Sequence, residues 1–572
     1  MWRGAGTSPG FKAALVALTT LVVALWLPRM QGPLDLRWDG GVYYVLGTSL
    51  AQGSGYRLLN EPGDIEATQY PPLYPILIAV HQVVAGTSDP TRVGMWLRVT
   101  SFLTSLAFVL ASYALLRRHL PPAWSFIGAV MCALHTSTVF LSDIAFAEIP
   151  FALATFCFFL WRRPDSTLLR DDLVTGGFAA AAYLLRTAGL ALLMAWVAES
   201  ILRRRAQQSL LRIGIALLVV GGWQGRIAAV EKDAAYSRPA YPYQRAEYLF
   251  YNVSYGRNVF LRDIEHPELG NLSLGELSER VASSLLTVPS RLGQAVTATE
   301  DDWAHQRARL QKLPLVGRAF HRRAPDVLLV LLGLVVIGGL LRQLVQTDRV
   351  IPLYVGAYVA LLCMTPAAWE SARYLLPIMP FLVIALWQCT LALRGWLQRR
   401  PRRSLATLGD VALVAVVALV ASVQLASLND LFRDRHQEVE YLDRSGTLVR
   451  YRLFYYRDAY RALDAGLDWL RQHASPTEII VSSMPHWVYL RTGMKAVMPP
   501  FETDPAKAQA LLEAVPATYL IIDGRTGSFT REYGLPAVTA ATDRWQLIYS
   551  SRAGELAIYR RVGVSLAHRS SD

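Results

Sequence analysis

The chain has 572 residues, of which 53% are hydrophobic and only 18% are charged. Soluble enzymes of this length are less apolar, so we expect most of the chain to lie in a lipid bilayer. The formal net charge of +13 does not indicate a nucleic-acid-binding protein, because the basic residues are dispersed over many connecting segments instead of forming one basic domain.

Apolar runs of the length that a membrane helix requires recur along the chain. A helix needs roughly 20 mostly apolar residues to cross the hydrocarbon core, and shorter runs imply tilt or burial. Arg186 interrupts the longer stretch 172–202, which we interpret as two short helices in a hairpin. With this hairpin, the pattern predicts a polytopic α-helical membrane protein with about 11 transmembrane helices. The single runs are 11–27, 97–116, 124–141, 149–161, 210–227, 327–341, 351–363, 375–393 and 411–428.

The arginine clusters predict the orientation of these helices. Short loops rich in Arg and Lys stay in the cytoplasm. The N-terminus is then cytoplasmic, and the loops 30–96, 142–148, 228–325 and 364–374 and the C-terminal segment lie outside. The excess of Arg over Lys is typical of a bacterium with a GC-rich genome, so we expect a multi-pass protein of the cell inner membrane. The clusters are Arg117 with Arg118, Arg162 with Arg163, Arg203 to Arg205, and Arg399, Arg400, Arg402 and Arg403.

The outer loops are long enough to carry structure of their own. In loop 30–96, Tyr43, Leu46 and Leu50 precede glycines that end a short amphipathic helix, which we expect at the membrane interface. A second helix, beginning at the proline-marked Tyr70 segment, is expected to dip into the outer leaflet. The loop 228–325 contains a helical stretch near 274–286, and we interpret it as an outer elaboration that could act as a lid.

The composition changes after the last apolar run, which predicts two domains. Residues 1–428 form the transmembrane domain, with the structured outer loops 30–96 and 228–325, and residues 429–572 form a small periplasmic α/β domain. From about Arg457, helical and strand patterns alternate. There is no phosphate-binding glycine loop. The expected elements are a helix through Tyr460, Leu463, Leu467 and Leu470, strands at 478–483 and 518–523, a helix from Asp504 to about Val515, and a hairpin at 547–561.

Two acids follow apolar runs at the outer side. Asp39 comes shortly after the first run, and Glu148 opens the fourth. A carboxylate within hydrogen-bond reach can accept a proton from an attacking hydroxyl or amine. Each acid also has a purely structural interpretation, because Asp39 could cap the following helix and Glu148 could sit favourably at a helix N-terminus.

Two arginines depart from the rule that basic residues stay inside. Arg186 lies at the tip of the predicted hairpin, and Arg373 directly precedes an apolar run. An arginine fork is suited to holding the phosphate of a lipid carrier at this depth. Alternatively, each side chain reaches towards lipid headgroups or pairs with a neighbouring acid such as Glu370.

Several of these motifs together resemble a known family. Asp39 followed by Tyr43 and Tyr44, YPPLYP from Tyr70, AEIPFALATF, the outer Arg186 and RYLLPIMPFL occur in this order. The pattern resembles polytopic glycosyltransferases with the GT-C fold, and is most similar to the protein O-mannosyltransferase and lipid A aminoarabinose transferase superfamily, glycosyltransferase family 39. In many members a glutamate follows the first-loop acid, whereas Gly40 follows Asp39 here.

The resemblance implies an inverting transfer of a sugar from a polyprenyl phosphate donor to an acceptor on the periplasmic face. The acceptor is a glycan, a lipid or a protein, and neither a metal nor another cofactor is implied. Asp39 and Glu148 are the catalytic acids that the resemblance implies: Asp39 matches the family's first-loop catalytic acid, and Glu148 matches its second-loop acid near the donor or acceptor. Arg186 and Arg373 are placed like residues that hold the carrier phosphate. The substrate groove is implied to include Tyr43, Tyr44, Tyr70 and Tyr74.

A multi-spanning transporter or flippase is the main alternative, since it also needs many spans and few intramembrane charges. We find no pair of inverted repeats with broken helices, which would favour it. A non-catalytic membrane scaffold is a second alternative, but it does not explain the acids in the first two outer loops.

Overall fold

The chain folds into two compact units, each built from three segments. The first unit comprises Met1–Met30, Val99–Trp223 and Leu274–Asp434, and the second comprises Gln31–Arg98, Gln224–Ser273 and Arg435–Asp572. The predicted domain limits, 1–428 and 429–572, differ in that they place the outer loops with the membrane helices. The computed structural model describes residues 9–264, 266, 269–312, 324–345, 349–366, 371–399, 403–551 and 554–563, so that Arg400, Arg402 and Glu370 lie outside the described residues.

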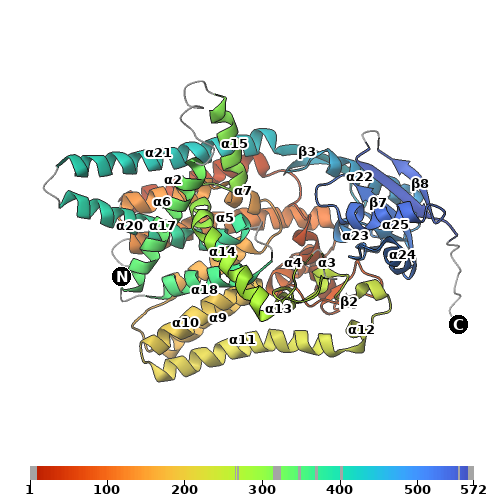
Figure 1. Cartoon of the computed structure of the whole chain (residues 1–572), viewed down its shortest axis with the longest axis horizontal. Coiled ribbons are helices and arrows are strands. Elements are labelled where there is room, and N and C mark those ends of the chain that lie inside the picture. Colours follow the sequence, from red (N-terminus) through yellow and green to blue (C-terminus); the bar gives the residue numbers. More distant parts are fainter. Residues whose placement is uncertain are drawn as a thin grey trace. The chain divides into compact units, whose positions relative to one another are not determined.

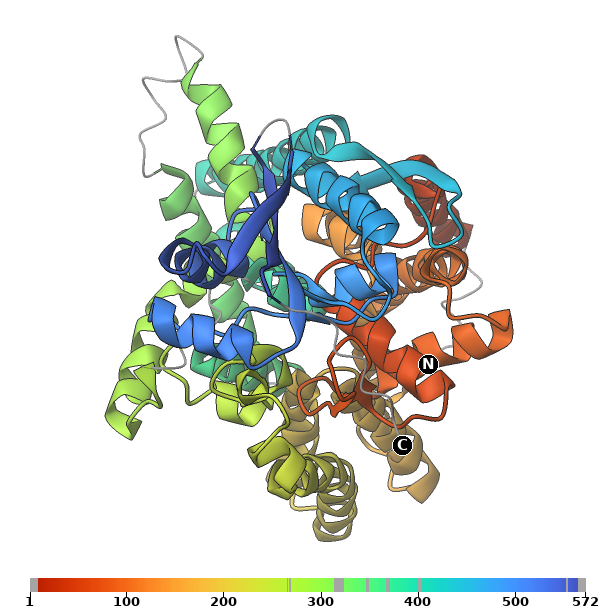
Figure 2. The same cartoon turned by 90° about the vertical axis from the view of Figure 1, so that its right-hand side faces the viewer.

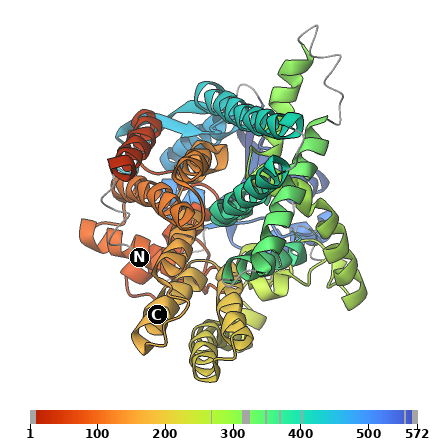
Figure 3. The ribbon, with the colours of Figure 1, turned by 90° about the vertical axis from the view of Figure 1, so that its left-hand side faces the viewer.

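The first unit is helical, and its helices can be followed in Figures 1 and 3. Among the described residues, six helices are long and apolar enough to cross a membrane, and five shorter apolar helices have 10–17 residues. The number of spans therefore stays a prediction. The helices that lie wholly or, for α5 and α11, mostly in this unit are α2 (Pro9–Trp26), α5 (Pro90–His119), α6 (Pro122–Leu134), α7 (Thr136–Leu141), α8 (Glu148–Trp161), α9 (Leu169–Leu185), α10 (Leu190–Leu202), α11 (Ala206–Lys232), α14 (Leu274–Ala295), α15 (Glu300–Gln311), α17 (Ala324–Leu344), α18 (Val350–Met364), α19 (Ser371–Leu375), α20 (Met379–Gln398) and α21 (Arg403–Asp434).

Most helices lie where the apolar runs predict them, with one interruption. The run predicted at 124–141 is broken at His135, whose backbone is extended between α6 and α7. The His135 side chain accepts a hydrogen bond from the Ser137 amide at 3.2 Å. A side chain that satisfies a backbone N–H in this way starts a new helix, so one apolar run forms two helices.

Three glycines allow close packing of α14, α17 and α20. A Cβ atom at Gly293, Gly333 or Gly339 would collide with a backbone carbonyl of the neighbouring helix. Small residues bring membrane helices into direct backbone contact, where van der Waals packing holds them together. The helical stretch predicted near 274–286 is longer than expected, since α14 runs from Leu274 to Ala295, and it packs along α17.

A five-stranded sheet forms the centre of the C-terminal segment of the second unit (Figure 2). The order is β6-β5-β7-β9-β8, with β5 parallel to β6 and β7, and β9 antiparallel to β7 and β8. Every residue of β7 is buried, which explains its continuous apolar sequence. The elements are α22 (Asp458–His473), β5 (Ile479–Val481), α23 (Pro485–Thr492), β6 (Ala496–Val497), α24 (Pro505–Glu513), β7 (Ala517–Asp523), α25 (Leu535–Ala540), β8 (Trp545–Ser550) and β9 (Leu556–Arg561).

The helices of this sheet begin and pack as the sequence predicts. Asp504 caps α24 by accepting hydrogen bonds from the amides of Ala506 and Lys507, at 2.9 and 3.0 Å. The predicted face of α22 is buried at Leu463, Leu467 and Leu470. These contacts confirm a small α/β domain.

The sequence analysis missed a hairpin at the start of this segment. Strands β3 (His436–Leu442) and β4 (Leu448–Phe454) pair antiparallel, with Glu440 opposite Arg450. In each strand, exposed charged residues alternate with buried residues, such as Val439 in β3 and Tyr451 in β4. The sequence analysis missed this alternation because the segment contains so many charged residues.

In the first outer loop, the second unit contains α3 (Asp39–Ala51), β1 (Arg57–Leu58), β2 (Ile65–Glu66) and α4 (Leu73–Ala85). The expectation of an amphipathic α3 is wrong, because the side chains from Gly40 to Ser49 are all buried. Gly47 makes this possible by admitting Ile78 of α4 against the α3 backbone. Helix α4 does keep an apolar exposed side, formed by Ile76, Val80, Val83 and Val84.

Candidate active site

In the first unit, three predicted site residues meet although they are far apart in the sequence. The Glu148 carboxylate, only 1% exposed, forms ion pairs with Nη1 of Arg186 and Nε of Arg373 through the same oxygen, Oε1. Glu148 is the first residue of α8, Arg186 lies in the break between α9 and α10, and Arg373 belongs to α19. The three elements therefore bring one acid and two guanidinium groups into a single cluster.

Aromatic rings surround these guanidinium groups. The guanidinium carbon of Arg373 lies 4.0 Å from the centre of the Phe146 ring, and that of Arg186 lies 5.2 Å from the Tyr374 ring. The side chains of Arg186 and Arg373 are only 14% and 16% exposed. A guanidinium group in such surroundings interacts more strongly with an anion than it does in water. Sequence reasoning missed Phe146 and Tyr374, although each neighbours a predicted site residue in the chain.

A third arginine, Arg29, is fully buried and fixes the segment that leads to Glu148. Nη1 of Arg29 donates hydrogen bonds to the Val139 carbonyl at 2.8 Å and to the Ser142 hydroxyl at 2.9 Å. The same nitrogen lies 3.9 Å from the Asp143 carboxylate. These contacts anchor the loop between α7 and α8, which leads directly to Glu148.

In the second unit, Asp39 is held among tyrosines. The Tyr70 hydroxyl donates a hydrogen bond to the Asp39 carboxylate at 2.9 Å, and burial together with the charge of Asp39 raises the pKa of Tyr70 well above its usual value. The Tyr43 ring lies edge-on to the rings of Tyr70 and Tyr74, with 5.0 Å between centres in both pairs. The hydroxyl of Tyr44, by contrast, donates to the Ser88 carbonyl at 3.0 Å. Of these tyrosines, Tyr70 contacts Asp39 directly, and Tyr43 packs between the rings of Tyr70 and Tyr74.

The backbone at the start of α3 is strained. Trp38, which precedes Asp39, has a φ of 53°, a left-handed conformation that is uncommon for a bulky side chain. Strained backbone of this kind persists only where the surrounding structure enforces it, and it is concentrated at functional sites. Asp39 belongs to the second unit, and Glu148 belongs to the first.

Glu61 is a buried acid of the first outer loop that the sequence analysis did not single out. Glu61 is fully buried and accepts hydrogen bonds from the hydroxyls of Tyr243 and Tyr251. The amides of Gln244 and Asn60 donate to it at 3.2 and 3.3 Å. Burial raises the pKa of Glu61 to about 7, against the hydrogen bonds that lower it. This carboxyl group ties the first outer loop to the segment around residue 250.

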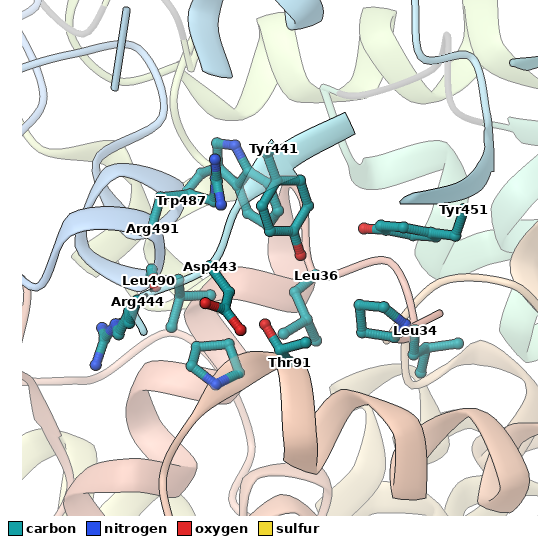
Figure 4. Close-up of a pocket in the computed structure, with 12 residues that line it drawn as sticks. Leu34, Leu36, Thr91, Tyr441, Asp443, Arg444, Tyr451, Trp487, Leu490 and Arg491 are labelled. Carbon is teal, nitrogen blue, oxygen red and sulfur yellow. Dashed lines mark hydrogen bonds between the residues drawn. The ribbon is translucent and has the colours of Figure 1, made fainter. Parts of the chain in front are cut away.

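The second unit also contains a small pocket, drawn in Figure 4. Tyr441, Tyr451 and Trp487 line it together with Arg491, whose guanidinium carbon lies 3.6 Å from the centre of the Tyr441 ring. Arg491 also forms an ion pair with Asp464 at 3.2 Å. Arg491 is already paired, and the Tyr441 ring packs edge-on against the rings of Tyr451 and Trp487, which indicates a packing role for these side chains. Among the described residues, no three His, Cys, Asp or Glu side chains gather as metal ligands would.

No protein-family model matches the chain, and no curated protein matches its sequence. Solved structures do match its fold. The oligosaccharyltransferase of Archaeoglobus fulgidus in the apo form is similar with a TM-score of 0.52 and 13% identity, over 99% of this chain and 75% of that chain. The oligosaccharyltransferase AglB from the same organism, in complex with an inhibitory peptide and a dolichol-phosphate, gives a TM-score of 0.51 and 13% identity, over 97% and 75%.

A third structure, ArnT from Cupriavidus metallidurans in the apo state, gives a TM-score of 0.49 and 12% identity, over 96% of this chain and 98% of that chain. The match to the oligosaccharyltransferase runs through the apolar helices and the C-terminal sheet, because it covers nearly the whole chain. The chain has the GT-C fold, a polytopic helical membrane fold with a C-terminal α/β domain.

Proposed function

We propose that the protein is a membrane glycosyltransferase that moves a sugar from a polyprenyl phosphate carrier to an acceptor on the periplasmic side of the inner membrane. The cluster of Glu148, Arg186 and Arg373 carries this proposal. Two nearly buried guanidinium groups in an apolar helical unit are costly unless they serve a function, and a phosphate on a lipid is an anion found at this depth. The fold supports the same conclusion, because a structure similar to this chain was solved with a dolichol-phosphate.

In this proposal, Arg186 and Arg373 bind the carrier phosphate and stabilise it as it leaves. A guanidinium group has five N–H donors, so an arginine that pairs with Glu148 through one nitrogen can still contact a phosphate oxygen through others. Glu148 positions both guanidinium groups, since its Oε1 contacts each of them. Negative charge grows on the phosphate during bond cleavage, and fixed cations in surroundings of low polarity therefore stabilise the transition state more than the bound donor.

Asp39 is assigned the role of general base. The acceptor hydroxyl or amine forms a bond to the anomeric carbon, and the bond from that carbon to the phosphate oxygen breaks. The proton of the acceptor passes to the Asp39 carboxylate, and the electron pair of the broken bond remains on the phosphate. A single displacement of this kind inverts the anomeric carbon. The hydrogen bond from Tyr70, at 2.9 Å, orients the carboxylate. We assign the substrate groove to Tyr70, to Tyr43, whose ring packs edge-on against it, and to Tyr74, which packs against Tyr43.

The test is to incubate the purified full-length protein with a panel of polyprenyl phosphate sugars and candidate acceptors. We expect release of free polyprenyl phosphate that depends on both donor and acceptor, together with an acceptor that has gained the sugar. The same preparation in sealed vesicles measures transport. Movement of the lipid across the bilayer without release of polyprenyl phosphate would overturn the proposal in favour of a transporter.

A further inference from the structure

Helix α23 of the C-terminal domain packs against the first turn of α3, where Asp39 lies. The closest approach is at Gly41, where a Cβ atom would lie 3.0 Å from the Cβ of His486. Any larger residue at position 41 would press against α23, which would have to shift by a few tenths of an ångström. Gly41 therefore brings His486, the second residue of α23, next to the start of α3.

The imidazole of His486 is buried, and one of its nitrogen atoms has no hydrogen-bond partner among the described residues. Its side chain is 6% exposed, and its ring lies edge-on to the Tyr251 ring with 4.8 Å between centres. Its Nε2 atom is buried and has no hydrogen-bond partner in the described part of the chain. Leaving a buried polar atom without a partner costs free energy, and such atoms are rare unless a ligand uses them.

The protonation state of the ring limits the chemistry of that ligand. Burial lowers the pKa of His486 to about 3, although the negative charge of the nearby Asp39 acts in the opposite direction. A neutral imidazole carries one N–H donor and one acceptor nitrogen, and it has no charge to attract a phosphate. A hydroxyl group, which can both donate and accept, is the matching partner.

We propose that His486 binds a hydroxyl group of the acceptor or of the transferred sugar beside Asp39. The inference rests on the proposed glycosyl transfer and adds a substrate-binding residue from the C-terminal domain. Asp39 would receive the proton of the attacking group, and the Nε2 atom of His486 would fix the orientation of a hydroxyl next to it. Sequence reasoning could not find this residue, because more than 400 positions separate His486 from Asp39 in the chain.

Three variants of His486 separate hydrogen bonding from packing. His486→Phe keeps an aromatic ring against Tyr251 but removes both nitrogens. His486→Gln places an amide group near the position of Nε2, whereas His486→Asn places it near the position of Nδ1. Each variant is assayed with the polyprenyl phosphate sugar and acceptor that the wild-type protein turns over, varying one substrate at a time.

We expect His486→Phe to raise KM about tenfold for the substrate that carries the hydroxyl group, as the loss of one hydrogen bond between neutral groups predicts. His486→Gln should restore most of the affinity, and His486→Asn should not. A rise confined to the acceptor KM assigns the hydroxyl to the acceptor, and a rise confined to the donor KM assigns it to the sugar.

The assignment of His486 would be overturned if His486→Phe kept the wild-type KM for both substrates, or if the Gln and Asn variants had equal KM values. Either result would leave the proposed function intact. If His486→Phe fails to fold, the KM values of His486→Gln and His486→Asn still test whether Nε2 binds a hydroxyl group. If the wild-type protein releases polyprenyl phosphate from no donor, the proposed function fails, and the role of His486 fails with it.

Discussion

Replacing Arg373 by alanine should weaken the binding of the polyprenyl phosphate carrier. Arg373 is mostly buried against the Phe146 ring, so water would screen its contact with a phosphate only weakly. A hydrogen bond to a charged group contributes about 1.5–3 kcal/mol, which corresponds to a roughly 10- to 150-fold increase in Kd. Arg186 still pairs with Glu148 in this variant, so the buried acid keeps a cation and the protein should fold. The Kd is measured by titrating the detergent-solubilised protein with undecaprenyl phosphate in a calorimeter.

The matched control is Arg394→Ala. Arg394 lies on α20 and pairs with Asp410 at 2.6 Å, but it is 38% exposed and belongs to no site described above. An exposed pair of this kind contributes little to stability, and its loss should leave the Kd unchanged. Equal affinity for undecaprenyl phosphate in wild type and Arg373→Ala would refute the assignment and would favour a role for Arg373 at lipid headgroups.

Two further substitutions test stability, one in each unit. Because the folded state holds the proton of Glu61 up to about pH 7 and the unfolded state releases it near pH 4.5, the contribution of Glu61 to stability is full below pH 4.5. This contribution should fall by about 3 kcal/mol as the pH rises to 7, at about 1.4 kcal/mol per pH unit. Glu61→Gln should remove this dependence of stability on pH. Hydrogen exchange of the segments around Glu61 and Tyr251, compared at pH 5 and pH 8, measures the dependence. The same pH dependence in Glu61→Gln as in the wild type would contradict the raised pKa. Gly333→Leu should destabilise the first unit by at least about 1–3 kcal/mol, because its side chain would collide with the Pro289 carbonyl. A wild-type melting temperature in detergent would show that α14 and α17 do not pack this closely.

Local patterns in the sequence predicted the helices and the C-terminal strands, because each signal lies within the segment that it describes. The apolar runs and the cap at Asp504 are examples. Tertiary contacts decided the cases that failed. Helix α3 is buried all round because Gly47 admits Ile78 of α4, and no local pattern reveals that contact.

The candidate site could be predicted only in part. Charge at an apolar boundary pointed to Glu148, Arg186 and Arg373, and the structure brings these three together. Their aromatic neighbours and the buried Glu61 carry no such signal, because an aromatic residue or a glutamate in an outer loop is common. The roles assigned to Asp39, Glu148 and the two arginines stay predictions.

Turnover of Asp39→Asn tests the central claim most directly. The variant keeps the size of the side chain but cannot accept a proton, so its single-turnover rate of polyprenyl phosphate release should fall by at least about 100-fold, and by up to about 10,000-fold. Its Kd for undecaprenyl phosphate should stay at the wild-type value, because Arg186 and Arg373 are intact. An undiminished rate of sugar transfer in Asp39→Asn would contradict the account.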